Sequence, residues 1–218
     1  MTSVLIVDDH GLLADGLALA LVAEGLRAAV HVPTSSQGII EAVAGGRPEV
    51  VLLDLDLGLG RGSGVELVGP LVALGANVVV LTGSTSRLAH AACLEAGAAE
   101  VVSKGEPFDD LVEALRRTTR GEQAFGRRRR EELLDELRRS RREHQRQLAP
   151  FERLTPREAA VLRELAAGAS AKTIARSTFV SVATVRSQIR GVLTKLDVGS
   201  QVAAVALANQ RGWLERPD

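Results

Sequence analysis

The sequence predicts an α/β domain with a doubly wound, five-stranded parallel sheet, joined by a charged helical linker to a small all-α domain of four helices. Over the first 120 residues, short uninterrupted apolar runs alternate with amphipathic stretches. This alternation is typical of strands buried on both faces of a parallel sheet and of their crossover helices. After residue 150, apolar residues recur only at helical spacing, and each stretch begins with a Ser or Thr that suits a helix N-cap.

The composition is that of a soluble globular protein. The chain has 218 residues, of which 45% are hydrophobic and 25% charged, so it is long enough for two domains. The single cysteine, Cys93, excludes an internal disulfide and a cysteine-based zinc site. The sequence shows no apolar run of bilayer length and no signal-peptide pattern. We therefore expect a cytoplasmic protein without a membrane partner.

The net charge of zero hides an asymmetry along the chain. Residues 1–120 contain 8 Lys and Arg against 15 Asp and Glu, which gives a net charge of −7. Residues 121–149 have a net charge of +3, and residues 150–218 have a net charge of +4. An acidic first part and a basic second part indicate different partners, and the basic part is compatible with nucleic acid.

The first domain is expected to alternate strands and helices. The expected strands are residues 3–7, 28–32, 50–53, 77–81 and 100–103, and the expected helices are residues 11–24, 35–44, 65–74, 87–96 and 108–120. Glycines punctuate these elements, and residues 58–64 contain four of them, so we expect a mobile loop there. Right-handed crossovers would place the helices on both faces of the sheet.

Polar side chains stand where these strands end. Asp8 and Asp9 follow the first strand, and Asp54 follows the third. A doubly wound sheet binds ligands beyond the carboxyl ends of its strands, so the three carboxylates would meet in one crevice and require a cation. Thr82 and Lys104 end the fourth and fifth strands. Carboxylates that hold Mg²⁺, beside a hydroxyl and an ammonium, suit phosphoryl transfer to an aspartate.

Residues 1–120 resemble the receiver domain of two-component response regulators, which has a flavodoxin-like fold. The resemblance is carried by the pair Asp8-Asp9, by Asp54, by Thr82 and by Lys104 with Pro107 after it. It implies that Asp54 is the phosphoacceptor and that Thr82 and Lys104 bind the phosphoryl group. It also implies Mg²⁺ bound by Asp9, Asp54 and the backbone carbonyl of Asp56, with Asp8 acting through a water. The phosphoryl donor would be a sensor histidine kinase or a small acyl phosphate.

Two positions depart from the receiver pattern. The loop at residues 58–64 is about two residues longer than is usual in the family. Val101 stands three residues before Lys104, where the family often has an aromatic switch residue. We therefore expect the signal to pass through Thr82 and the helix at 87–96, and substitution of Val101 to leave the response largely intact.

Two other functions remain open at this point. A receiver-like module could regulate DNA binding through protein interactions without accepting phosphate. The segment Asp54-Leu55-Asp56 also resembles the paired aspartates of haloacid-dehalogenase-type phosphatases, although that family has its pair after the first strand and a Thr or Val where this chain has Gly58. We expect a regulator rather than an enzyme.

The composition divides the chain into a domain at 1–120, a linker at 121–149 and a second domain at 150–218. The linker contains four consecutive arginines, 127–130, and many charged residues that favour helix. We expect a solvated helix over about 127–148. Leu134, Leu137 and Leu148 fit a heptad only loosely, so a coiled coil stays possible.

The second domain begins with a strong helix-start signal. In Thr155-Pro156-Arg157-Glu158, Thr155 and Glu158 can form a capping box, with proline at the first helical position. A short helix from Ser170, a tight turn at Phe179-Val180 and a capped helix over 182–196 follow, and a fourth helix starts at Ser200. A short helix, a tight turn and a second helix with basic outer positions make a helix-turn-helix.

Residues 154–212 resemble the LuxR-type DNA-binding domain. The resemblance is carried by Leu154 to Glu158, Ala167-Gly168, Lys172, Ile174-Ala175, Val180-Ser181, Thr184-Val185 and Lys195-Leu196. A receiver joined to such a domain is the combination of NarL/FixJ-type transcriptional regulators, which implies double-stranded promoter DNA as a partner and a homodimer. Gly191 would cost helix 182–196 about 1 kcal/mol relative to alanine.

The helix at 182–196 has an outer face without acidic residues. We expect Arg186, Ser187 and Arg190 to face the bases, because recognition helices read with their N-terminal half. We expect Lys172, Thr184 and Lys195 to contact phosphates.

Overall fold

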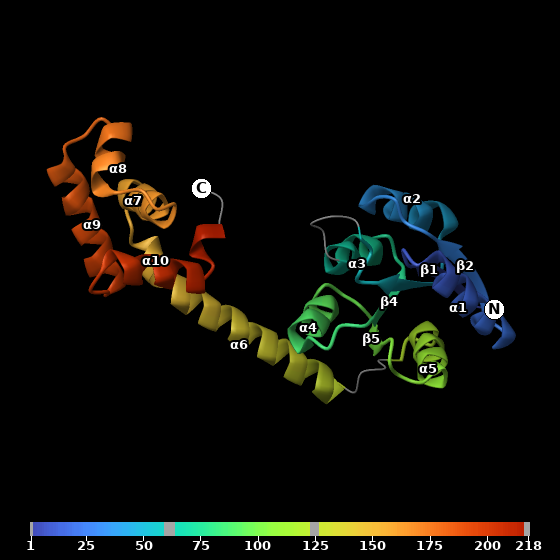
Figure 1. The fold of residues 1–218 in the computed structure, drawn as a ribbon. Helices are drawn as coiled ribbons and strands as arrows, with labels where there is room; N and C mark the ends of the chain where they lie inside the picture. The colour runs from blue at the N-terminus through green and yellow to red at the C-terminus, as the bar shows by residue number, and fades with distance from the viewer. Residues whose placement is uncertain (1, 59–63, 123–126, 216–218) are drawn as a thin grey trace. The chain divides into compact units, whose positions relative to one another are not determined.

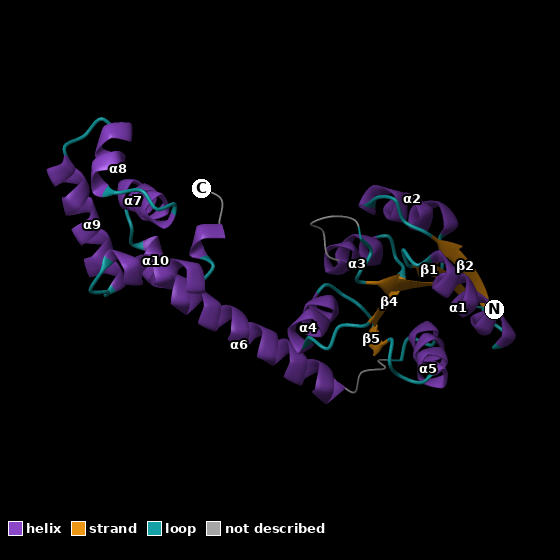
Figure 2. Cartoon of the chain, in the orientation of Figure 1, coloured by secondary structure: helices purple, strands orange, loops and turns teal. Residues whose placement is uncertain are grey.

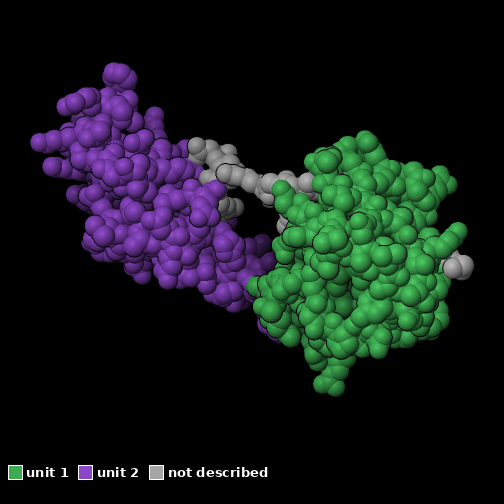
Figure 3. Space-filling model, turned by 45° about the vertical axis from the view of Figure 1, so that its right-hand side comes forward, with its two compact units in different colours: residues 1–138 green, residues 139–218 purple. Residues whose placement is uncertain are grey.

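The computed structural model describes residues 2–58, 64–122 and 127–215. The chain forms two compact units, residues 1–138 and 139–218, which Figure 3 shows in different colours. The division falls within one helix, α6 (Arg127–Glu152). Each unit has hydrophobic core clusters of its own.

Unit 1 contains the predicted five-stranded parallel sheet, with helices on both faces (Figures 1 and 2). The strands are β1 (Ser3–Val7), β2 (Arg27–His31), β3 (Val50–Asp54), β4 (Asn77–Thr82) and β5 (Glu100–Ser103). The helices between and after them are α1 (Gly11–Ala23), α2 (Ser36–Gly46), α3 (Gly64–Ala73), α4 (Arg87–Glu95) and α5 (Phe108–Thr119). The strand order is β2-β1-β3-β4-β5, and all neighbours are parallel. The predicted fold class is confirmed, and element ends move by at most two residues.

Two apolar clusters lie on opposite faces of this sheet. Residues of α1 and α5 pack on one face with Val4, Ile6 and Leu52. Residues of α2, α3 and α4 pack on the other face with Val51 and Leu53. Every residue of β3 is buried, because this central strand is covered on both faces. The uninterrupted apolar run in the sequence follows from this double burial.

A glycine fixes how α3 begins beside the central strand. Gly64 donates a backbone hydrogen bond to Leu55 O at 3.1 Å. A Cβ atom at Gly64 would lie 2.7 Å from Leu55 Cα, so no larger residue fits there without a shift of backbone. The mobility that we predicted for the loop 58–64 concerns mainly residues 59–63, which lie outside the described residues.

The helix α6 differs from the solvated helix that we predicted. It continues to Glu152, and it buries its leucines in two separate cores. Leu133 and Leu137 are 4% and 6% exposed and belong to the core of unit 1, while Leu148 is 5% exposed and belongs to that of unit 2. Leu133 and Leu137 lie on one helix face because they are four residues apart. The leucines considered for a coiled coil therefore pack within the units: Leu134 and Leu137 in unit 1, and Leu148 in unit 2.

Unit 2 contains the four predicted helices with their predicted caps. They are α7 (Pro156–Ala166), α8 (Ala171–Ser177), α9 (Val182–Leu196) and α10 (Gln201–Gln210), followed by a 3₁₀ turn, Trp213–Glu215. Thr155, Ser170, Ser181 and Ser200 each accept a hydrogen bond from the backbone N–H of the third residue of the following helix. In the described part of the chain, no single helix is long and apolar enough to cross a membrane, although the bent pair α9 and α10 meets that test when the two are counted together.

A buried carboxylate joins α7 to α9 in unit 2. Glu158 Oε2 accepts hydrogen bonds from Thr155 N at 2.7 Å, from Thr155 Oγ1 at 3.0 Å and from Lys195 Nζ at 2.6 Å. Burial raises the pKa of Glu158, but these hydrogen bonds outweigh it and hold the pKa below its ordinary value. The other oxygen, Oε1, lies where a Cβ atom of residue 191 would be. A larger residue at position 191 would therefore have to displace the end of the Glu158 side chain, which packs against α9.

This packing reverses the expected effect of alanine at position 191. Helix propensity alone would favour Gly191→Ala by about 1 kcal/mol. The new methyl group would displace the Glu158 carboxylate, which three donors hold in place. We predict that Gly191→Ala brings no gain or a net loss in the free energy of unfolding, measured by urea denaturation. A gain of about 1 kcal/mol would contradict the prediction.

Candidate functional site

Three carboxylates converge at the carboxyl ends of β1 and β3. The two strands are neighbours, with Val7 paired to Leu53, so the residues that follow them lie side by side. Asp8 and Asp54 are only 3% and 2% exposed. One ligand atom each from Asp8, Asp9, His10 and Asp54 lies within 4.8 Å of the others. The structure thus brings together three of the four predicted metal ligands, and Asp56 follows at the exposed edge, with its N–H 3.3 Å from Asp54 Oδ1.

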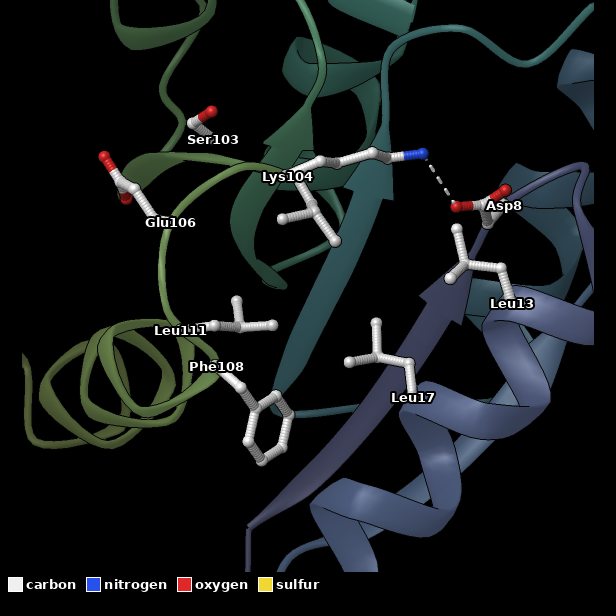
Figure 4. A pocket seen from close by; sticks show the side chains of 9 residues that line it. Asp8, Leu13, Leu17, Ser103, Lys104, Glu106, Phe108 and Leu111 are labelled. Carbon is white, nitrogen blue, oxygen red and sulfur yellow. Dashed lines mark hydrogen bonds and ion pairs between the residues drawn. The ribbon is translucent and has the colours of Figure 1, made fainter.

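Lys104 spans the cluster from the end of β5. Its Nζ lies 2.8 Å from Asp54 Oδ2 and 3.1 Å from Asp8 Oδ2, and Figure 4 shows the contact with Asp8. The backbone N–H of Lys104 donates a hydrogen bond to Thr82 O at 2.8 Å, which fixes the Lys104 backbone beside the end of β4. The lysine predicted from the strand-end pattern therefore contacts the predicted acceptor.

Burial and hydrogen bonding balance differently for the pKa of Asp54 and the pKa of Lys104. Burial raises the pKa of Asp54, and the hydrogen bonds from Lys104 and from the Asp56 N–H offset this only in part. Burial lowers the pKa of Lys104, but its hydrogen bonds to Asp54 and Asp8 outweigh the burial and leave the pKa above its ordinary value. A carboxylate whose buried charge is not fully compensated gains from an additional cation nearby.

The donor set of this cluster fits a hard divalent cation. Asp9 Oδ1 is a buried oxygen without a hydrogen bond, although His10 Nδ1 lies 2.7 Å from it. Carboxylate oxygens are the ligands that Mg²⁺ prefers, together with water and phosphate oxygens. Asp8, Asp9 and Asp54 would hold such an ion, which would supply positive charge for phosphoryl oxygens.

The predicted switch residues lie beside the cluster. Thr82 is fully buried at the end of β4, and its Oγ1 accepts a hydrogen bond from Ser84 N at 3.0 Å. Val101 is 8% exposed and belongs to the same core cluster as Leu133 and Leu137 of α6. The expectation that substitution of Val101 leaves the response largely intact stays a prediction, and its burial means that a larger side chain there would also have to fit into this core.

Unit 2 presents a basic surface on α8, the following turn and α9. Val185, Ile189, Val192 and Leu196 form the buried stripe of α9. The predicted DNA-contacting residues Lys172, Thr184, Arg186, Ser187 and Arg190 are exposed. Lys195 is different, because it is only partly exposed and its ammonium pairs with buried Glu158. Residues 169–196 contain five basic and no acidic side chains, which suits a polyanionic partner.

Comparison with known proteins identifies both units. Residues 4–116 match the response regulator receiver domain, and residues 152–208 match the bacterial regulatory proteins of the luxR family. The chain is 34% identical to a nitrate/nitrite response regulator protein homolog of Haemophilus influenzae over 208 residues, which cover 94% of each chain. It is 33% identical to the nitrate/nitrite response regulator NarP of Escherichia coli, over 96% of this chain and 95% of NarP.

The chain belongs to the NarL/FixJ-type response regulators. These are DNA-binding transcriptional regulators that join a receiver domain to a LuxR-type helix-turn-helix domain. A solved complex of the response regulator RcsB with DNA resembles the chain with a TM-score of 0.52 and 24% identity, over 95% of this chain and 98% of the other, which shows similarity of fold. The receiver match assigns Asp54-Leu55-Asp56 to a receiver rather than to a haloacid-dehalogenase-type phosphatase.

The sequence did not identify His10 as part of the response regulator's acidic site. His10 is the N-cap residue of α1, and its side chain makes no capping hydrogen bond. Its backbone N–H donates to Asp8 Oδ1 at 2.8 Å, and its ring Nδ1 lies 3.2 Å from the same oxygen. The position of His10 directly after the Asp8-Asp9 pair is the feature of the sequence that could have indicated these contacts.

The contact between Lys104 and Asp54 predicts a change in proton affinity. Lys104→Met removes an ammonium that lies 2.8 Å from the Asp54 carboxylate, while it keeps a similar side-chain length. Because the lysine lowers the pKa of Asp54, that pKa should rise further in the variant. Carbon-13 NMR titration of the carboxyl groups would measure it, with Asp54→Asn to assign the signal. An unchanged or lower pKa would contradict the prediction.

Proposed function

We propose that the protein is a transcriptional regulator that accepts a phosphoryl group on Asp54, in a Mg²⁺-dependent reaction, from a sensor histidine kinase or a small acyl phosphate. The observation that carries the proposal is the contact of Lys104 with buried Asp54 and Asp8 at one sheet edge. A carboxylate oxygen of Asp54 would form the new P–O bond. The P–N bond of the phosphohistidine would break, and the leaving imidazole would keep the electron pair and take a proton from solvent.

The residues around Asp54 would have different roles in this transfer. Lys104 would move its ammonium from the carboxylate to a phosphoryl oxygen, and the Thr82 hydroxyl would donate to a second one. Asp8 and Asp9 would hold Mg²⁺, which supplies charge for the remaining oxygens when it is bound. The same residues favour this proposal over an atypical receiver that never accepts phosphate, because they surround one carboxylate with phosphoryl-binding groups.

An apolar surface beside the site is a suitable docking place for a kinase. A pocket of about 210 Å³ is lined by Leu13 and Leu17 of α1, by Phe108 and Leu111 of α5, and by Asp8, Leu81, Ser103, Lys104 and Glu106 at or near the sheet edge (Figure 4). On α1, Leu12 and Leu19 are 90% and 73% exposed. A kinase that delivers a phosphoryl group to Asp54 would bind over this surface, where exposed apolar side chains favour protein contact.

We propose that α9 enters the major groove of double-stranded promoter DNA, as one half of a homodimer on a two-fold or direct repeat. Arg186 and Arg190 lie one turn apart on the exposed face, and arginine can pair with guanine O6 and N7. Ser187 would lie beside them against the bases, and Lys172 and Thr184 would contact phosphates. Lys195 would contact a phosphate only with the N–H groups that its pairing with Glu158 leaves over. This partner, together with the kinase, is consistent with a cytoplasmic location, and phosphorylation would change dimerisation and promoter binding.

The assignment of Asp54 predicts a specific loss of labelling. With Mg²⁺ and an acyl phosphate, the wild type should gain one phosphoryl group in intact mass, and Asp54→Asn should gain none. Asp9→Ala should also lose labelling, because Asp9 would bind the metal directly. Asp15→Asn, an exposed substitution on α1, is the matched control and should label as the wild type does. Equal labelling of Asp54→Asn and wild type would overturn the assignment.

The two kinds of DNA contact predict different losses. Arg186→Ala should cost about 1–3 kcal/mol and relax base preference at one position per half-site. Lys172→Ala should weaken binding to all sequences alike and lower the salt slope by roughly one unit. Lys172 is a cleaner test of a phosphate contact than Lys195, because truncation of Lys195 would also leave Glu158 unpaired. Binding to a randomised site library at two salt concentrations separates these outcomes.

A uniform loss in Arg186→Ala, with unchanged base preference, would show that another residue faces the bases.

A further inference from the structure

The first turns of α6 cover α4, the helix that follows the switch residue Thr82. The Arg130 guanidinium donates hydrogen bonds to Leu94 O at 2.6 Å, in the last turn of α4, and to Ala98 O at 3.1 Å, in the segment between α4 and β5. The Leu94 carbonyl lies at a helix end and gains from a cationic donor. At the other end of α4, Glu136 accepts a hydrogen bond from Arg87 Nε at 2.9 Å.

These contacts make α6 an antiparallel partner of α4. Arg130 and Glu136 are six residues apart, or about 9 Å along α6, and they meet residues of α4 that are seven residues apart, or about 10.5 Å. Between them, Leu133 and Leu137 are buried in the core of unit 1. Residues 130–137 of α6 are thus held to α4 by polar contacts of Arg130 and Glu136 and by the apolar packing of the two leucines between and beside them.

A chain of hydrogen bonds connects the phosphoryl site to this helix pair. Thr82 Oγ1 accepts from Ser84 N, and Ser84 Oγ accepts from Ser86 N at 3.2 Å. Ser86 caps α4, and His90 Nε2 lies 2.8 Å from Ser84 O. If the Thr82 hydroxyl turns toward a phosphoryl group, the loop and the first turn of α4 must readjust. That readjustment would alter the position of Arg87 relative to Glu136.

We propose that residues 128–138 of α6 act as a latch on α4, and that a phosphoryl group on Asp54 releases it. The same helix places Leu148 and Phe151 in the core of unit 2, so release would free the segment that leads into the DNA-binding domain. This inference rests on the proposed phosphorylation of Asp54. Because coupling is reciprocal, a weakened latch should in turn favour the phosphorylated state.

Hydrogen exchange on the full-length protein tests the release. With Mg²⁺ and an acyl phosphate, backbone amides in 128–138 and 87–98 should exchange faster than in the untreated protein, and Asp54→Asn should show no change. Intact mass of the same sample reports phosphorylation separately. Full phosphorylation with unchanged or slower exchange would overturn the latch and leave the proposed function standing. A failure to gain a phosphoryl group would overturn both.

Matched arginine variants test the reciprocity. Arg130→Ala removes both carbonyl contacts, whereas Arg128→Ala removes a 93% exposed side chain that pairs with Glu132. Arg130→Ala should raise the affinity for beryllofluoride, a mimic of the phosphoryl group, by about fivefold in calorimetry with Mg²⁺. Arg128→Ala should leave it unchanged. Glu136→Gln, which weakens the contact with Arg87, should raise the affinity as Arg130→Ala does. This second variant keeps the test valid if Arg130→Ala folds poorly. Equal affinities in all four proteins would contradict the proposal.

A separate observation concerns the turn between α8 and α9. Phe179 has a φ of 56°, in the left-handed region that bulky residues rarely adopt, and it is 96% exposed. Both properties oppose folding, because the backbone is strained and a phenyl ring faces water. Glycine at this position would make the folded state more stable, because it adopts a positive φ without strain.

We infer that the Phe179 ring packs against the sugar-phosphate backbone of DNA beside the major groove. Phe179 lies two residues before Ser181, the N-cap of α9, whose first turns would enter the groove. Lys172, Arg176 and Arg186 lie on the two helices that flank the turn, within a segment that has no acidic residue. An apolar ring with cationic neighbours fits deoxyribose between phosphates, so Phe179 would position the recognition helix.

Opposite effects on stability and binding distinguish this role from a structural one. Phe179→Gly should raise the midpoint of thermal unfolding, because it relieves backbone strain, and should weaken DNA binding by about tenfold. Phe179→Tyr should keep the affinity. Leu19→Ala, which truncates another exposed apolar side chain, should change neither property. A loss of stability with unchanged affinity in Phe179→Gly would overturn the inference, as would a change of oligomeric state without DNA.

Discussion

The ion pair between Lys104 and the buried carboxylates of Asp54 and Asp8 is the interaction on which the receiver site depends. Two carboxylates at the ends of adjacent parallel strands repel each other, and burial makes that repulsion more costly. Lys104, the residue after β5, offsets it only in part, as the raised pKa of Asp54 indicates. The site is therefore prepared for further positive charge and for a ligand that can accept the lysine's hydrogen bonds.

The same principle operates in unit 2 with a different outcome. Glu158 is buried and accepts hydrogen bonds from Thr155 and Lys195, which hold its pKa below the ordinary value. Side chains and backbone of the protein itself provide the hydrogen bonds of this carboxylate. It therefore fixes α7 against α9 and needs no ligand. Compensation by neighbours thus separates a structural carboxylate from one that is available for chemistry.

The proximity of the receiver-site side chains could be predicted from the sequence, because a parallel sheet gathers its strand ends at one edge. Asp8, Asp54 and Lys104 could be placed together from that rule alone. The docking of α6 could not be predicted, because two leucines in a strongly charged helix give a weak signal, and the carbonyls that Arg130 contacts lie more than thirty residues earlier. The strain at Phe179 was also hidden, since a turn was evident but the sign of its φ was not.

The most direct measurement locates the phosphoryl group itself. Borohydride reduces an aspartyl phosphate to homoserine, and tandem mass spectrometry of peptides then gives the position of the modified residue. After treatment of the full-length protein with Mg²⁺ and an acyl phosphate, homoserine should be found at position 54 and at no other aspartate. Homoserine at position 8, 9 or 56, or its absence from a protein that binds DNA normally, would contradict the role of Asp54.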